Sequence, residues 1–99
     1  MRWWRMRDCI MVKVIRFTAP WCAPCRMLAP IIETLKNEIS DVEWEVVDVD
    51  QHPEKAAEKG IRSVPTVMIY NGDTLVETIV GVVSKNDYTK VITNAKNIF

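Results

Sequence analysis

The sequence contains 99 residues, of which 48% are hydrophobic and 26% are charged. This length and composition suit one domain with a hydrophobic core and exclude a second domain of ordinary size within the sequence. Thirteen Lys and Arg residues balance thirteen Asp and Glu residues, so the net charge gives no reason to expect binding to nucleic acid or to an anionic membrane.

The apolar residues of segment 1–11 are interrupted by charged ones, so the segment lacks the continuous apolar run of a signal peptide. No other segment approaches the roughly 18 consecutive apolar residues that span a bilayer. We therefore expect a cytoplasmic protein. In such a reducing compartment, a close pair of cysteines is more often catalytic or metal-binding than part of a structural disulfide framework.

The first half of the chain shows a strand, a helix and a second strand. The β-branched run Val12–Thr18 predicts a strand that ends before Pro20. Residues 23–38 repeat apolar side chains at spacings of three and four, which predicts an amphipathic helix kinked at Pro30. The mostly alternating run 42–49 predicts the next strand.

A short helix is predicted over residues 53–59, because Pro53 suits a first helical turn and Gly60 suits the left-handed conformation that ends a helix. Two further β-rich runs, 66–70 and 74–80, flank an Asn-Gly turn signal and predict a hairpin.

Ser84 is the predicted N-cap of a last helix, whose apolar positions again follow helical spacing. The predicted order is therefore β-α-β-α-β-β-α. Strands joined through helices imply parallel pairing, and the hairpin adds an antiparallel pair, so we expect an α/β domain with a mixed sheet and helices on both faces. The sheet has four strands over residues 12–99, or five if the extension 1–11 forms a short strand instead of a flexible segment.

The motif Trp-Cys-Ala-Pro-Cys stands where the first strand gives way to the first helix. Unpaired backbone N–H groups and the positive end of the helix dipole favour the thiolate form of Cys22, the predicted nucleophile. One helical turn brings Cys25 close enough to displace whatever Cys22 has captured, so Cys25 is the predicted resolving thiol. Pro24 stiffens the first turn without breaking it.

A zinc site is the alternative interpretation, because a Cys-x-x-Cys pair is half of one. Zinc needs about four ligands, and the other soft candidates, Cys9 and His52, do not form a second pair. We therefore predict no metal, and we interpret His52 as a surface loop residue.

From about Val12 to its end, the sequence resembles the thioredoxins. The resemblance rests on the segment FTAPWCAPCRMLAP at residues 17–30, on Asp-Val-Asp at 48–50, on GIRSVPT at 60–66 and on Gly81 after the last predicted strand. It implies a thioredoxin-like fold in a short chain of glutaredoxin size.

The same resemblance assigns roles around the cysteines. It implies a cis peptide bond between Val64 and Pro65 beside the two sulfurs, with the exposed backbone of Val64 pairing with an extended substrate segment. Trp21, Pro24 and Pro65 support the active site by this resemblance. The residues that it places in contact with the substrate are Ser63, Val64, Val80 and Gly81.

The function that the resemblance implies is reduction of protein disulfides by dithiol exchange, with no bound cofactor. The electrons come from a thioredoxin reductase that uses NADPH, or from a glutathione-linked system, and the protein is expected to be a monomer. Two alternatives remain open at this point: a binding subunit in which the fold is kept and the dithiol is incidental, and a disulfide oxidase or isomerase. Serine replacement of both cysteines and equilibration against a glutathione buffer distinguish these classes.

Two residues depart from the thioredoxin pattern. Arg16 occupies a position that is usually acidic; either it extends past the sheet without a catalytic role, or its charge favours a thiolate at one of the two cysteines. Titration of both thiols in an Arg16→Leu variant separates these hypotheses. Ala23 replaces the more common Gly, in a position that influences the reduction potential, and we expect a potential at the reducing end of the range.

The extension 1–11 replaces a strand and a helix that full-length thioredoxins carry before the strand leading to the motif. We expect Trp3, Trp4 and Met6 to pack on the sheet, the alternative being a tail that binds a partner or a membrane surface. The first strand is then either an edge strand or the neighbour of a makeshift strand within residues 3–10. Cys9 is interpreted as a small apolar filler, with a regulatory disulfide as the alternative.

Overall fold

The computed structural model describes residues 12–39 and 41–97, so the predictions for residues 1–11, including those for Cys9, lie outside the described residues. The elements follow the predicted order, with bounds β1 (Val12–Thr18), α2 (Ala23–Glu38), β2 (Val42–Asp48), α3 (Pro53–Glu58), β3 (Thr66–Asn71), β4 (Thr74–Val80) and α4 (Lys85–Lys96). The predicted fold class is confirmed, and no helix in the described ranges is long and apolar enough to cross a bilayer.

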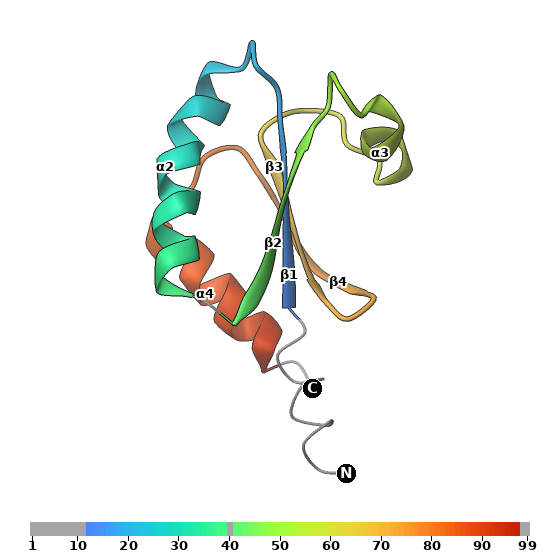
Figure 1. Cartoon of the computed structure of the whole chain (residues 1–99). Coiled ribbons are helices and arrows are strands. Elements are labelled where there is room, and N and C mark those ends of the chain that lie inside the picture. Colours follow the sequence, from blue (N-terminus) through green and yellow to red (C-terminus); the bar gives the residue numbers. More distant parts are fainter. Residues whose placement is uncertain (1–11, 40, 98–99) are drawn as a thin grey trace.

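The sheet has the strand order β2-β1-β3-β4 (Figure 1). β1 pairs in parallel with β2 and antiparallel with β3, while β3 and β4 form the antiparallel hairpin. β1 is therefore an inner strand with a described strand on each side, so both predicted placements, at an edge or beside a makeshift strand within residues 3–10, are wrong. Among the described strands, β2 is the edge strand on that side.

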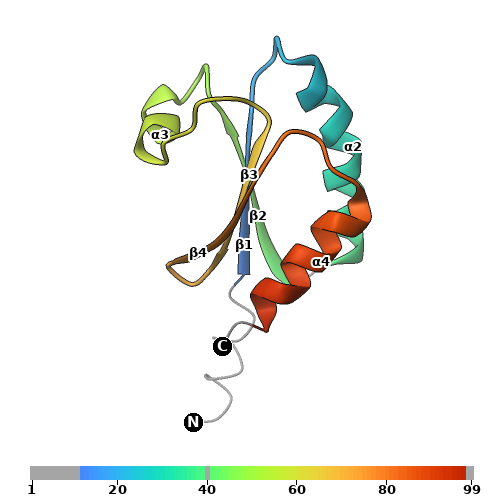
Figure 2. The same ribbon diagram turned by 180° about the vertical axis from the view of Figure 1, so that it is seen from behind.

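Helices cover both faces of the sheet. α2 and α4 lie on one face and α3 lies on the other, as the two opposite views show (Figure 1, Figure 2). Alternation along β1 divides its side chains between the faces: Val12 and Val14 join the core beneath α2 and α4, whereas Ile15 and Phe17 join the cluster on the α3 side.

The hairpin turn differs by one residue from its prediction. Asn71 ends β3 and pairs with Thr74 in the ladder, so the two turn residues are Gly72 and Asp73. Asn71 is buried, and its side-chain amide donates a 2.8 Å hydrogen bond to the carbonyl oxygen of Ala95 in α4. This contact holds Asn71 in the sheet, and Gly72, at a φ of 61°, becomes the first turn residue.

Candidate active site

Cys22 and Cys25 lie at the start of α2, directly after the carboxyl end of β1. Cys22 is the N-cap of the helix, and its Sγ atom accepts a 3.2 Å hydrogen bond from the backbone N–H of Cys25. The two Cα atoms are 5.2 Å apart, and the two sulfurs are joined as a disulfide. Pro24 stands in the first helical turn, where its missing N–H leaves no intrahelical bond unmade. The motif is thus built into the helix start, as its sequence position predicts.

The cysteines are enclosed on one side by a small apolar cluster. Ala19, Cys22 and Cys25 are buried together, with half-buried Val49 and Val64 packed against them. The relative exposure is 4% for Cys22 and 2% for Cys25. Both cysteines are therefore buried, and they differ in position: Cys22 is the N-cap residue, whereas Cys25 lies within the first turn of α2.

Val64 lies directly beside the first cysteine. Its carbonyl oxygen is 3.7 Å from Cys22 Sγ, a distance at which the thiol of the reduced protein donates a weak hydrogen bond. The peptide bond between Val64 and Pro65 is cis. Ser63 belongs to the same loop, and its carbonyl oxygen accepts a 2.7 Å hydrogen bond from Thr66 Oγ1. This loop therefore presents backbone next to the sulfur pair.

The end of β4 joins the same loop. The N–H of Gly81 donates a 2.9 Å hydrogen bond to the carbonyl oxygen of Pro65, and Gly81 adopts a φ of 90° that disfavours a side chain. Val80 precedes it with 63% of its surface exposed, and Trp21 is 67% exposed. The loop that carries Ser63, Val64 and Pro65 thus connects Cys22 to the end of β4, and the large apolar side chains of Trp21 and Val80 are open to solvent.

Asp50 is a site residue to which the sequence reasoning gave no role. Its Oδ2 accepts a 2.9 Å hydrogen bond from the indole N–H of Trp21. Asp48 shapes the turn that carries Asp50, because Asp48 Oδ1 accepts hydrogen bonds from the backbone N–H groups of Asp50 and Gln51. The resemblance of Asp-Val-Asp at 48–50 to thioredoxins indicated that this segment matters, but it did not predict the hydrogen bond between Trp21 and Asp50.

Arg16 lies on the face of β1 that α2 covers, and it is half-buried. Its Nε atom is buried without a hydrogen-bond partner in the described protein. Burial lowers the pKa of Arg16 from its usual value, and the negative charge of Glu33 partly offsets this effect. The side chain thus stays within the helix-sheet layer instead of passing beyond the sheet. The effect of its charge on the thiols stays a hypothesis.

His52 lies at the surface as predicted. It is the N-cap residue of α3, about half of its side chain is exposed, and its Nδ1 is 3.5 Å from a carboxylate oxygen of Glu54. Within residues 12–39 and 41–97, no three His, Cys, Asp or Glu side chains are grouped so that they could hold a metal ion.

The chain is similar to known proteins in both sequence and structure. The family model described as Thioredoxin matches residues 7–94. "Thioredoxin 1" of Synechococcus elongatus is 44% identical over 73 residues, which are 73% of this chain and 68% of that protein. "Thioredoxin M-type, chloroplastic" of Chlamydomonas reinhardtii is 41% identical over 73% of this chain, but the match spans only 52% of that protein. The solved structure of Fasciola hepatica thioredoxin superposes with a TM-score of 0.81 at 32% identity, covering 95% of this chain and 89% of that one.

Proposed function

Since the chain belongs to the thioredoxin family and is a thiol–disulfide oxidoreductase that reduces protein disulfides through Cys22 and Cys25, we propose that Cys22 is the attacking sulfur and Cys25 the resolving one. The observation that carries this assignment is the position of Cys22 as the N-cap of α2, where its Sγ accepts the N–H of Cys25. Such a donor and the helix dipole stabilise negative charge on the sulfur.

The proposed exchange has two steps. The Cys22 thiolate attacks one sulfur of the substrate disulfide, that S–S bond breaks, and its electron pair leaves on the other substrate sulfur, which takes up a proton. Cys25 gives up its thiol proton and attacks Cys22 Sγ, the bond between Cys22 Sγ and the first substrate sulfur breaks, and that sulfur leaves with the electron pair and takes up the second proton. The substrate gains two electrons and two protons, and the enzyme ends with the Cys22–Cys25 disulfide whose partners lie 5.2 Å apart at their Cα atoms.

We propose that a substrate segment docks over Trp21, Ser63, Val64, Val80 and Gly81. The exposed side chains of Trp21 and Val80 offer apolar contact area, and Val64 offers backbone beside Cys22. A segment that pairs with the backbone of Val64 brings its own disulfide next to Cys22 Sγ, which lies 3.7 Å from the Val64 carbonyl oxygen.

The docking proposal is tested by placing a charge in the apolar area. Val80→Glu should slow the reduction of insulin disulfides while leaving the reduction of a small aromatic disulfide nearly unchanged, because only the protein substrate needs the docking surface. Leu75→Glu is the matched control, since Leu75 is also exposed on β4. Equal loss on both substrates, or an equal effect of the control, contradicts the proposal.

The family's chemistry needs no bound cofactor, and we propose that a thioredoxin reductase using NADPH regenerates the dithiol, with a glutathione-linked system as the second source. We further propose that the protein acts as a monomer in the cytoplasm, where a reducing environment keeps the pair in the dithiol form that a reductase needs.

The decisive experiment is equilibration of Cys22–Cys25 against glutathione buffers of known ratio. If Cys22–Cys25 remains a disulfide in glutathione buffers that reduce the disulfide of an oxidase, its reduction potential is low and the protein is a reductant. A pair that is reduced at oxidising ratios contradicts the reductase assignment and favours an oxidase or isomerase. Parallel assays with NADPH plus thioredoxin reductase, and with glutathione plus glutathione reductase, identify the electron donor.

A further inference from the structure

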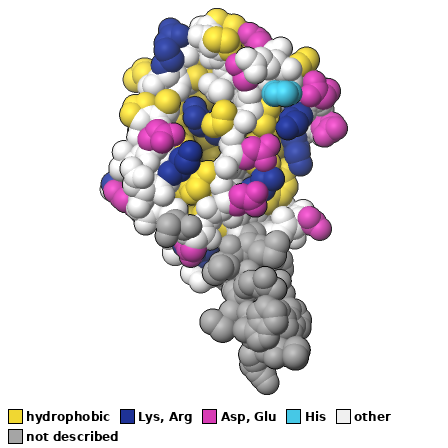
Figure 3. Space-filling model, viewed as in Figure 1, with side chains coloured by type: hydrophobic (Ala, Val, Ile, Leu, Met, Phe, Trp, Pro, Cys, Tyr) yellow, Lys and Arg dark blue, Asp and Glu magenta, His cyan; other side chains and the backbone are white. Residues whose placement is uncertain are grey.

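A small cavity lies between α2 and the sheet, and neither Cys22 nor Cys25 is among its lining residues. It has a volume of about 40 Å³, and its lining residues come from β1, β2 and α2: Val14, Arg16, Ile32, Lys36, Trp44, Glu45 and Val46. Figure 3, which has the same viewpoint as Figure 1, shows Lys and Arg side chains beside apolar ones in the hollow between α2 and β2. Since one water needs roughly 10–15 Å³, this cavity admits a group of a few heavy atoms.

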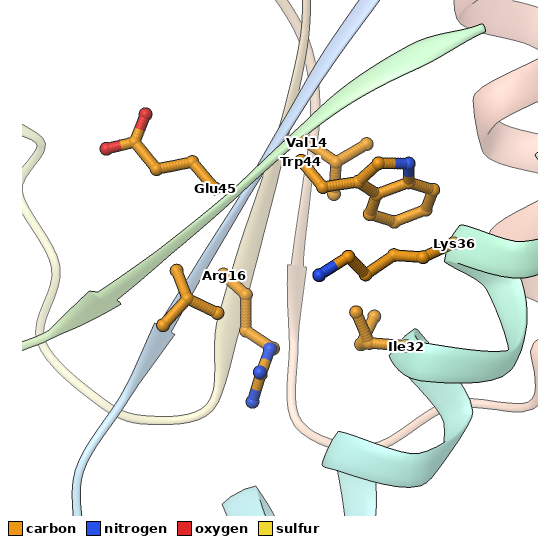
Figure 4. Close-up of a pocket in the computed structure, with 7 residues that line it drawn as sticks. Val14, Arg16, Ile32, Lys36, Trp44 and Glu45 are labelled. Atoms are coloured by element: carbon orange, nitrogen blue, oxygen red, sulfur yellow. The ribbon is translucent and has the colours of Figure 1, made fainter. Parts of the chain in front are cut away.

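Arg16 brings an unused donor to this cavity. Arg16 and Lys36 both extend into the space between α2 and the sheet (Figure 4). The Nε atom of Arg16 is buried and has no hydrogen-bond partner in the described protein. A buried polar atom of this kind is costly unless a partner satisfies it, and the planar guanidinium fork fits an oxyanion through two parallel hydrogen bonds.

The acidic residues around the cavity leave it with excess positive charge. The carboxylate of Glu45 points to the other side of β2 (Figure 4), where it is 2.8 Å from Lys13 and 4.0 Å from Lys55. Glu33 is the remaining acidic neighbour: it is 3.7 Å from Lys36 and also raises the pKa of Arg16. The carboxylate of Glu33 therefore balances only one of the two positive charges of Arg16 and Lys36, and one bound monoanion would balance the other.

The other walls are apolar. Val14, Ile32 and Trp44 face the two cations, and Val46, which also lines the cavity, is 53% exposed. Indole and aliphatic walls suit a ligand with a short hydrocarbon part, whereas a bare inorganic anion leaves them solvated. We propose that Arg16 and Lys36 form a binding site for a carboxylate carried on a small apolar group. Either a free carboxylic acid or the C-terminal carboxylate of a peptide supplies this chemistry. The proposal is independent of the redox function.

The test is titration of the full chain with isobutyrate, with N-acetylvaline and with isobutyramide as the uncharged isostere, followed by NMR of the backbone amides and of the tryptophan indole N–H groups. Saturable shifts at Val14, Ile32 and the Trp44 indole are expected with the carboxylates only. Tighter binding of N-acetylvaline than of isobutyrate identifies a peptide C-terminus as the preferred source, and the reverse order identifies a free acid.

Two variants assign the contacts. Arg16→Met and Lys36→Met each remove one cation while keeping a long side chain, and each should weaken isobutyrate binding about tenfold, the effect of losing one charge-assisted hydrogen bond. Lys90→Met is the matched control, because Lys90 is an exposed lysine of α4 away from the cavity. Lys36 is partly exposed, so its variant keeps the test valid if Arg16→Met does not fold. The absence of saturable shifts, equal binding of isobutyramide, or an equal loss in Lys90→Met overturns the proposal.

Discussion

The indole N–H of Trp21 donates a 2.9 Å hydrogen bond to Asp50, which joins the turn that carries the cysteines to the turn that follows β2. Trp21 is otherwise 67% exposed, so few packing contacts fix its position. The hydrogen bond therefore holds a large apolar side chain in place beside Cys22 before a substrate arrives.

Replacing Asp50 with Ala should lower kcat/KM for a protein disulfide by about two- to tenfold, because a typical hydrogen bond contributes about 0.5–1.5 kcal/mol. The measurement is the rate of insulin reduction, with a small aromatic disulfide as the second substrate. Asp73→Ala is the matched control, since Asp73 is an exposed carboxylate in the distant hairpin turn. Unchanged kinetics in Asp50→Ala would show that Trp21 does not need this bond.

The fold could be predicted largely because its elements are short and strongly patterned. β1 combines β-branched residues with an apolar face, and Pro20 stops it, so both its bounds follow from the sequence. The hairpin turn was displaced by one residue because Asn71 is bound by α4 through Ala95, a contact between residues 24 positions apart that no local turn preference encodes.

The site was predictable only in part, for the same reason. Cys22 and Cys25 are close in sequence, and the start of a helix fixes their relation locally. Asp50 meets Trp21 across 29 positions, so only the folded chain brings them together. Arg16 stands at a strand position that faces α2, and its burial follows from the strand register instead of from the surface preference of arginine.

Serine substitutions should separate the roles of the two cysteines. Cys25→Ser is expected to accumulate a mixed disulfide between Cys22 and the substrate, because the resolving attack is lost. Cys22→Ser is expected to form no such adduct and to lose activity, because Cys25 lacks the N-cap position and the backbone N–H donor that stabilise a thiolate at Cys22. Non-reducing electrophoresis and mass spectrometry of the adduct measure both outcomes.

Alkylation adds a kinetic check on the same roles. In the reduced protein at neutral pH, iodoacetamide should modify Cys22 before Cys25. Faster modification of Cys25, or an adduct formed by Cys22→Ser, would reverse the assignment of the two sulfurs.

The ion pair between Lys13 and Glu45 should give a small acid-dependent part of the stability. Their charged groups are 2.8 Å apart, and the hydrogen bond from Lys13 lowers the pKa of Glu45 below its usual value near 4.5. A carboxylate with a lowered native pKa stabilises the fold above its unfolded pKa, and this contribution is lost as pH falls through the native pKa. Both side chains are about one-third exposed, so the effect is limited to about 0.5 kcal/mol.

Urea unfolding of Lys13→Met at pH 7 and at pH 3 measures this contribution. The variant should be less stable than the native protein at pH 7, and the difference should shrink at pH 3. Lys90→Met should show no such pH-dependent difference, since Lys90 is an exposed lysine of α4. A difference that is the same at both pH values would show that Lys13 acts through packing alone.

Replacing Tyr88 with Phe should leave the free energy of unfolding at pH 7 unchanged or raise it by about 1 kcal/mol. Tyr88 belongs to α4 and is fully buried in the core. Its hydroxyl has no hydrogen-bond partner in the described protein. A buried hydroxyl without a partner costs free energy that phenylalanine does not incur, while the ring packing is kept. Tyr70→Phe is the comparison, because the Tyr70 hydroxyl donates a 3.7 Å hydrogen bond to the sulfur of Met68.

Tyr88→Phe should also change how the free energy of unfolding depends on pH above pH 9. Burial raises the pKa of Tyr88 to about 12, although the charge of Arg16 acts in the opposite direction, whereas the unfolded chain titrates near 10. Between pH 10 and pH 12 the unfolded state releases the phenolic proton and the native state keeps it. The stability that is present below pH 10 is therefore lost as the pH rises, by an amount on the order of 2 kcal/mol. The difference in unfolding free energy between the native protein and Tyr88→Phe, followed from pH 9 to pH 12, should therefore move in favour of the variant. A difference that stays constant over this range would mean that the Tyr88 hydroxyl ionises as readily in the folded protein as in the unfolded chain.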